Sequence, residues 1–151
     1  MTAMVVMEMG RFLISTDRSK LDVDVIHRFL ARSYWAEGIP RETVVRSIEN
    51  SLCFGVYDNS SQIGFARVIS DFATYAYIAD VFILEPYRRR GLAKELMATI
   101  MAHPELQGLR RWSLGTRDAQ GLYAQFGFKP AVNRPTRTIM EIADPDIYSR
   151  S

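Results

Sequence analysis

The chain has 151 residues and a mass of 17.3 kDa, a common size for a single domain that buries a core without disulfides or metals. Hydrophobic residues make up 48% and charged residues 24%, which excludes a largely disordered chain. The 19 basic and 17 acidic residues give a net charge of +2, too balanced to indicate a nucleic acid or a membrane surface as partner. We expect one soluble domain over residues 1–151.

The single cysteine, Cys53, cannot form a disulfide within the chain, which favours a reducing, cytoplasmic compartment. It lies in the apolar run SLCFGVY with no histidine at metal-ligand spacing, so we expect a buried, inert thiol and no metal. The N-terminal MTAMVVMEMGRF lacks the basic start of a signal peptide, contains Glu8, and is too short to span a membrane.

The first part of the chain predicts one strand followed by two helices. RFLIST, over 11–16, has strand character, and Asp22 can cap a helix whose apolar residues recur at helical spacing. Gly38 and Pro40 end this helix, and Pro40 suits the first turn of a second one. The expected apolar faces are Val25, Ile26, Phe29 and Leu30 in the first helix, and Val44, Val45 and Ile48 in the second.

From Ser51 the pattern changes towards strands. SLCFGVYD and SQIGFARVIS flank the turn residues Asp58, Asn59 and Ser60 and predict a hairpin. TYAYIADVFIL, rich in aromatic and β-branched residues, predicts a buried strand that ends before Pro86. The remaining expected elements are a helix over GLAKELMATIMAH, a strand over RRWSLGT, a helix over DAQGLYAQFG capped by Asp118, and a last strand over TRTIMEI (136–142).

The order of these elements indicates the fold class. Hairpin-connected strands are antiparallel, whereas the strand–helix–strand crossover from TYAYIADVFIL to RRWSLGT requires a parallel pair. The sequence therefore predicts an α/β protein, in the sense of an α+β mixed sheet.

The segment VFILEPYRRRGLAKEL carries the clearest chemical signal. A buried strand enters a turn that contains Arg88, Arg89, Arg90 and Gly91, and a helix begins at once. Such a turn directs unpaired backbone N–H groups and the positive end of a helix dipole at one point, where a phosphate or pyrophosphate fits. Gly91 permits the close approach of that ligand. A solvated basic surface is the alternative interpretation of the three arginines.

Two motifs make the chain resemble the GCN5-related N-acetyltransferase (GNAT) superfamily. Arg88, Gly91 and Ala93 match its signature Arg/Gln-x-x-Gly-x-Gly/Ala, and LYAQFGFKP supplies a tyrosine, Tyr123, followed by a Gly-Phe pair. The motifs occur in the family's order, with a strand between them and a hairpin before them. The resemblance covers about residues 11–142. It implies a mostly antiparallel central sheet with a splayed parallel strand pair and helices on both faces.

That resemblance implies direct transfer of an acetyl group from acetyl-coenzyme A (acetyl-CoA), as co-substrate, to a primary amine in a ternary complex. The strand edge at Phe82 and Ile83 would pair with the pantetheine arm, and the Ile83 N–H would stabilise the oxyanion. Tyr123 would donate a proton to the leaving thiolate. Thr116 stands where the family often has an asparagine that helps to hold coenzyme A. The pyrophosphate would be held by backbone amides of Arg88, Arg89, Arg90, Gly91, Leu92 and Ala93.

The general base and the acceptor site are less well determined by the sequence. Asp80 is a candidate base, because an acidic residue in a buried strand is unusual; a salt bridge to Arg67 or a structural hydrogen bond is the alternative. Tyr34 and Trp35, in SYWAEGIP, could wall an acceptor pocket or stack on a cationic amine. Tyr77 could line the same cavity. Structural packing is the alternative role for all three.

The expected acceptor is a small-molecule amine. Two alternatives stay open: a protein or peptide N-acetyltransferase with an open groove around Trp35, and a coenzyme A-binding sensor without turnover. The nearly balanced charge disfavours a nucleic-acid acceptor. A homodimer through the C-terminal strands is a further hypothesis.

Overall fold

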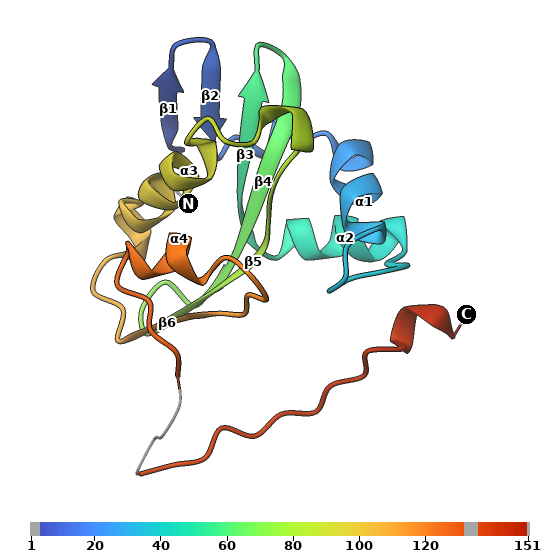
Figure 1. The fold of residues 1–151 in the computed structure, drawn as a ribbon, viewed down its shortest axis with the longest axis vertical. Helices are drawn as coiled ribbons and strands as arrows, with labels where there is room; N and C mark the ends of the chain where they lie inside the picture. Colours follow the sequence, from blue (N-terminus) through green and yellow to red (C-terminus); the bar gives the residue numbers. More distant parts are fainter. Residues whose placement is uncertain (1–3, 132–135, 151) are drawn as a thin grey trace.

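A computed structural model describes residues 4–131 and 136–150 (Figure 1). Its strands form one six-stranded sheet whose spatial order follows the chain, β1-β2-β3-β4-β5-β6. Neighbouring strands are antiparallel except β5 and β6, which are parallel. The predicted mixed sheet is confirmed. The strands are β1 (Val6–Met9), β2 (Phe12–Ser15), β3 (Leu52–Asp58), β4 (Ser61–Ser70), β5 (Tyr75–Ile83) and β6 (Arg111–Leu114).

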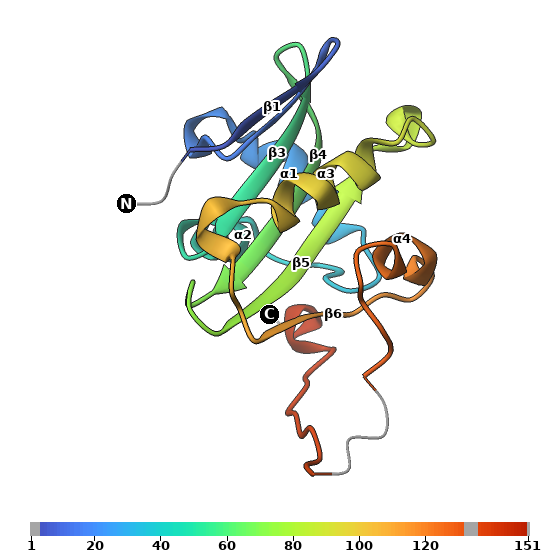
Figure 2. The ribbon, with the colours of Figure 1, turned by 90° about the vertical axis from the view of Figure 1, so that its left-hand side faces the viewer.

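Helices cover both faces of the sheet, as the resemblance implied. α1 (Val23–Ala31) and α2 (Arg41–Glu49) lie on one face, and α3 (Leu92–Met101) and α4 (Gln120–Ala124) lie on the other (Figures 1 and 2). Each face buries its own apolar cluster. None of the helices in the described residues is long and apolar enough to cross a bilayer.

Local capping explains where the helices begin. The Asp22 carboxylate accepts the N–H groups of Asp24 and Val25 and starts α1, as predicted. The predicted cap of α4, Asp118, is wrong. Ala119 occupies that position, and its N–H donates to the Thr116 hydroxyl at 3.0 Å, which closes the turn before the helix.

Two predictions at the ends of the chain are wrong. The strand over 11–16 exists as β2, but it is not the first: Val6–Met9 forms β1, and Gly10, with φ 59°, makes the turn between them. TRTIMEI, over 136–142, is extended but forms no strand, and none of the described strands pairs with it. Its β-branched residues favour a strand, yet a strand also needs a neighbour, and β6 remains the edge of the described sheet.

β5 carries the irregularity that shapes the site. Asp80 and Val81 together stand opposite Ala66 of β4, which makes a β-bulge, and Asp80 adopts φ 56°. β6 pairs with β5 only as far as Ile78. β5 then continues to Ile83, and no described strand pairs with it on that side. The parallel pair therefore separates beyond the bulge.

Candidate functional site

The loop between β5 and α3 presents main-chain donors. Arg89 and Gly91 have left-handed conformations, with φ 64° and 77°, the kind of backbone that turns neighbouring N–H groups into an anion-binding concavity. α3 begins at the buried Leu92, followed by the half-buried Ala93. The amides of this first turn have no acceptor within the helix, and Gly91 supplies no side-chain cap. The predicted loop residues are thus brought together, but the Arg88 N–H is not a free donor, because it donates to the Glu85 carbonyl at 3.2 Å.

The approach to these donors is open. A Cβ added at Gly91 would meet no atom within 4 Å, so nothing in the described residues covers this point. The side chains of Arg88, Arg89 and Arg90 are exposed beside it. The Arg90 guanidinium lies 5.9 Å from the centre of the Tyr87 ring. The geometry suits an anion that reaches the backbone from solvent.

The open edge of β5 ends at this loop. The Leu84 N–H donates to the carbonyl of Ile63 in β4 at 2.8 Å. Because N–H groups alternate between the two sides of a strand, the Ile83 N–H faces away from β4, towards the open edge. The Ile83 carbonyl faces the same way and accepts the Arg88 Nε at 2.9 Å. One strand position therefore offers a donor to a ligand and anchors the loop.

Tyr123, on α4, is 8% exposed. Its ring packs edge-to-face on Phe128, with 6.2 Å between centroids. Burial, with a smaller contribution from Tyr34, raises the pKa of the Tyr123 phenol above its ordinary value. A phenol with a raised pKa keeps its proton at neutral pH and is available as a donor. Tyr123 and Thr116 also line a hollow of about 1000 Å³ between β6 and α4.

Tyr34 links the loop after α1 to the loop after β6. The Arg117 guanidinium lies 3.9 Å from the centre of the Tyr34 ring, and the Arg117 N–H donates to the Tyr34 hydroxyl at 3.3 Å. The Trp35 ring packs edge-on against Tyr34, with centroids 5.1 Å apart. Sequence reasoning missed Arg117, because nothing in its own surroundings marks it as the partner of a residue 83 positions away.

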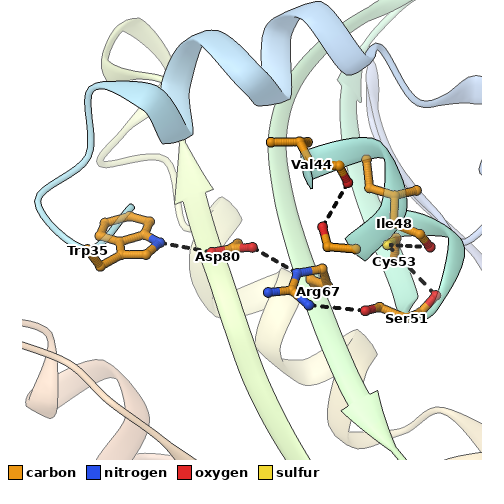
Figure 3. Close-up of polar contacts among 8 residues, drawn as sticks. Trp35, Val44, Ile48, Ser51, Cys53, Arg67 and Asp80 are labelled. Atoms are coloured by element: carbon orange, nitrogen blue, oxygen red, sulfur yellow. Dashed lines mark hydrogen bonds and ion pairs between the residues drawn. The ribbon is translucent and has the colours of Figure 1, made fainter. Parts of the chain in front are cut away.

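Asp80 is held on both carboxylate oxygens (Figure 3). One accepts the Arg67 Nε at 2.8 Å and the other accepts the Trp35 Nε1 at 2.9 Å. Arg67 in turn donates to the Ser51 hydroxyl at 3.1 Å. The Asp80 side chain is 9% exposed. The ion pair with Arg67, which the sequence suggested as the alternative to a base, is confirmed. The second oxygen of Asp80 holds Trp35 beside the bulge.

The other two predicted residues differ in placement. Phe82 turns its ring into the core beneath α1, where it stacks on Phe29 with centroids 4.0 Å apart. By the same alternation its backbone N–H faces β4, so of the two predicted edge residues only Ile83 offers a donor to the open edge. Tyr77 is partly exposed on β5. Its hydroxyl lies 3.9 Å from where a Cβ of Gly115 would stand, at the end of β6. Tyr77 therefore borders the same separation of β5 and β6.

Other chemically notable groups stand apart from this region. Cys53 is a free, buried thiol, as expected, and burial raises its pKa to about 12. A hollow of about 460 Å³ lies near Cys53 and Ser70, at the end of the sheet opposite the β5–α3 loop. Among the described residues, no group of three or more His, Cys, Asp or Glu side chains could hold a metal ion.

Comparison with known proteins agrees with this geometry. A protein of Gibberella zeae named as an acetyltransferase is 30% identical over 77% of this chain and 77% of its own length. A crystal structure from Xanthomonas campestris pv. campestris, described as an acetyltransferase of the GNAT family, is 50% identical. It superposes with a TM-score of 0.88 over 94% of this chain and 99% of its own.

A third protein, a GNAT family acetyltransferase from Elizabethkingia anophelis, has acetyl-CoA bound in its crystal structure. It is 13% identical, with a TM-score of 0.61 over 80% of this chain and 78% of its own, and so supports the fold alone. Residues 23–128 match the family model described as Acetyltransferase (GNAT) family. With this match and the relatives described above, the chain belongs to the GNAT acetyltransferase family.

Proposed function

We propose that the protein transfers an acetyl group from acetyl-CoA to the primary amine of a small molecule, by direct attack in a ternary complex. The observation that carries this proposal is the separation of the parallel strands: β5 runs on past Ile78 with a free edge that ends at the β5–α3 loop. The loop amides suit a pyrophosphate. The free strand edge suits the amide-bearing pantetheine arm, since a strand edge binds extended amides through its backbone.

The residues then divide the chemistry between them. The amine nitrogen attacks the thioester carbonyl carbon, and the Ile83 N–H stabilises the charge that develops on the carbonyl oxygen. One such donor contributes about 3 kcal/mol to other acyl transfers. As the carbon–sulfur bond breaks, Tyr123 donates its phenolic proton to the thiolate. The proton lost by the amine nitrogen goes to a base or to water, and Tyr123 is reprotonated from solvent.

Asp80 remains a candidate for that base. Its contacts with Arg67 and Trp35 support a positioning role instead, because both carboxylate oxygens already accept hydrogen bonds. The contact between Tyr34 and Arg117 supports a small acceptor, since it joins the two loops that a peptide groove would need apart. We also infer a reducing, cytoplasmic location, in which the free Cys53 stays reduced.

The proposal is tested by two measurements on the same protein. Calorimetry measures acetyl-CoA binding, and a thiol-release assay measures turnover across a panel of small amines and peptides with free amino groups. We expect micromolar binding and release with at least one small amine. Binding without release from any acceptor would indicate a sensor, release with peptides alone would indicate a peptide acetyltransferase, and absence of both would refute the proposal.

A further inference from the structure

Arg117 carries a positive charge that its surroundings compensate only weakly. Its guanidinium lies over the Tyr34 ring, 3.9 Å from the centroid. Within the described residues its ion-pair partner is the neighbouring Asp118, and the two groups are 3.9 Å apart, longer than a hydrogen bond. Both side chains are largely exposed, at 64% and 75%, so water screens the pair. The charge of Arg117 is therefore available to a ligand.

The contact with Tyr34 fixes the direction of this charge. A guanidinium that lies over an aromatic ring turns its face to the ring, and its N–H groups point outward in its own plane. The Tyr34 hydroxyl also accepts the main-chain N–H of Arg117 at 3.3 Å, so two contacts join the residues. Two parallel N–H donors match the two oxygens of a carboxylate. Arg117 is thus oriented in advance for a carboxylate.

The position of Arg117 connects it to the separation of β5 and β6. On the β5 side, the Asp80 carboxylate at the bulge holds Trp35 (Figure 3), and the Trp35 ring packs on Tyr34. On the β6 side, Tyr34 contacts Arg117, which directly follows Thr116 in the lining of the hollow. A continuous row of side chains therefore runs between the two strands, with Arg117 at its β6 end.

The other charged group of this row is already compensated. Asp80 is paired with Arg67 at 2.8 Å, and the two side chains are only 9% and 17% exposed, so the negative charge is balanced within the pair. Arg117, by contrast, has no carboxylate at hydrogen-bond distance in the described residues. An acceptor that lies along this row therefore meets a positive charge, which favours an anionic group and disfavours a second ammonium group.

We propose that the acceptor is a small primary amine that also carries a carboxylate, such as an amino acid, and that Arg117 binds this carboxylate. Tyr34 positions the guanidinium, and the amino end of the acceptor reaches the thioester. The inference rests on the proposed acetyl transfer and adds the acceptor class to it. Arg117 lies outside the loop proposed for coenzyme A, so its replacement should change which amine is used and leave coenzyme A binding intact.

The first test compares ω-amino acids of increasing chain length, each with its own primary carboxamide, in the thiol-release assay. With rates corrected for the fraction of unprotonated amine, we expect kcat/KM for the best acid to exceed that for its amide by about tenfold or more, as a charge-assisted bidentate contact provides. Arg117→Gln should remove this preference by slowing the acid alone. Arg117→Glu should favour the diamine of the same length. Equal use of acid and amide by the wild type, or a preference that survives Arg117→Gln, would overturn the proposal.

Arg11→Gln is the matched control. Arg11 also lies over an aromatic ring, 5.0 Å from the centre of Phe12, and its side chain is 54% exposed. It stands in the turn between β1 and β2, at the opposite edge of the sheet. The variant loses the same charge and should keep the preference for the acid. Equal loss of the preference in both variants would mean that net charge sets it, and would overturn the proposal.

A binding measurement separates this proposal from acetyl transfer itself. Calorimetry with protein saturated with coenzyme A, which has no acetyl group to transfer, compares the affinities for the best acid and its amide. We expect the acid to bind about tenfold more tightly, and Arg117→Gln to abolish the difference. Discrimination in binding without turnover of any amine would refute acetyl transfer and keep the carboxylate site. Turnover without discrimination would refute the carboxylate site and keep acetyl transfer, and absence of both would refute both.

Discussion

The part of the candidate site proposed for acetyl-CoA (the donor side) and the part proposed for the amine (the acceptor side) are formed by different kinds of group. The donor side, over residues 83–93, consists of backbone N–H groups held by the left-handed Arg89 and Gly91 and the start of α3. The side proposed for the acceptor consists of side chains from separate elements, such as Trp35 on Asp80 and Arg117 on Tyr34. The backbone N–H groups of the donor side suit a co-substrate that is always the same, and the side chains of the acceptor side suit one specific amine.

The difference has a physical consequence for substitution. The side chains of Arg89 and Arg90 are exposed, so replacing them leaves the backbone donors in place, whereas Arg88 also holds the Ile83 carbonyl through its Nε. On the acceptor side each side chain is held by a partner on another element, so one replacement releases a second residue. We therefore expect acetyl-CoA binding to weaken mainly when a substitution changes backbone geometry. We expect amine binding to weaken when either member of a contacting pair of side chains is replaced.

The largest effect is expected at Tyr123, the proposed proton donor. Tyr123→Phe removes the proton donor and keeps the ring, so kcat should fall by about 100-fold or more with little change in KM. Burial raises the pKa of the Tyr123 phenol above its ordinary value of about 10. Tyr123 should therefore stay protonated as the pH rises through neutrality, and wild-type activity should fall from loss of this proton only at a pH above about 10. Tyr57→Phe, in β3, is the control. An unchanged kcat for Tyr123→Phe would remove Tyr123 from the mechanism.

Gly91→Ala should damage the donor side through its backbone. The substitution adds a Cβ where the ligand approaches and places alanine at φ 77°, so KM for acetyl-CoA should rise about tenfold, with a stability loss of about 1 kcal/mol. Gly108→Ala is closely matched, with φ 75° and no atom within 4 Å of the added Cβ. It should cost similar stability and leave KM unchanged. Equal effects of both variants on KM would mean that Gly91 acts only through folding.

The acceptor side should respond as a coupled pair. Trp35→Phe removes the N–H that Asp80 accepts and keeps an aromatic ring, so we expect KM for the amine to rise severalfold. Asp80→Asn should do the same, with kcat reduced less than tenfold, and the double variant should be less than additive. A fall in kcat of about 100-fold or more for Asp80→Asn, with loss of the acidic limb of the pH profile, would make Asp80 the base.

The smallest effect is expected outside both sides, at Tyr57. Its hydroxyl is enclosed without a hydrogen-bond partner in the described residues, and an enclosed unpaired hydroxyl opposes folding. Tyr57→Phe should therefore leave the free energy of unfolding unchanged or raise it by up to about 1 kcal/mol, measured by urea denaturation. A loss of more than about 1 kcal/mol would show that the hydroxyl has a partner in solution.

Several features of the fold were predictable because their causes are local. Asp22 caps α1 through its own next residues, and Asn59 turns the β3–β4 hairpin at φ 55°. The strand predicted over 136–142 could not be judged in this way, because a strand also needs a neighbour to pair with and none of the described strands pairs with this segment. The same limit hid β1, a short strand that depends on pairing with β2.

The candidate site also divides into features with local causes and features that depend on tertiary packing. The sequence by itself determined that a helix begins directly after Gly91, and the first amides of a helix have no acceptor within it. Only the tertiary structure decided what Asp80 contacts: it lies at a bulge that brings Arg67 and Trp35, from a neighbouring strand and a distant loop, onto its two oxygens. Local conformation follows from nearby residues, whereas a side chain's partners are chosen by how separate elements pack.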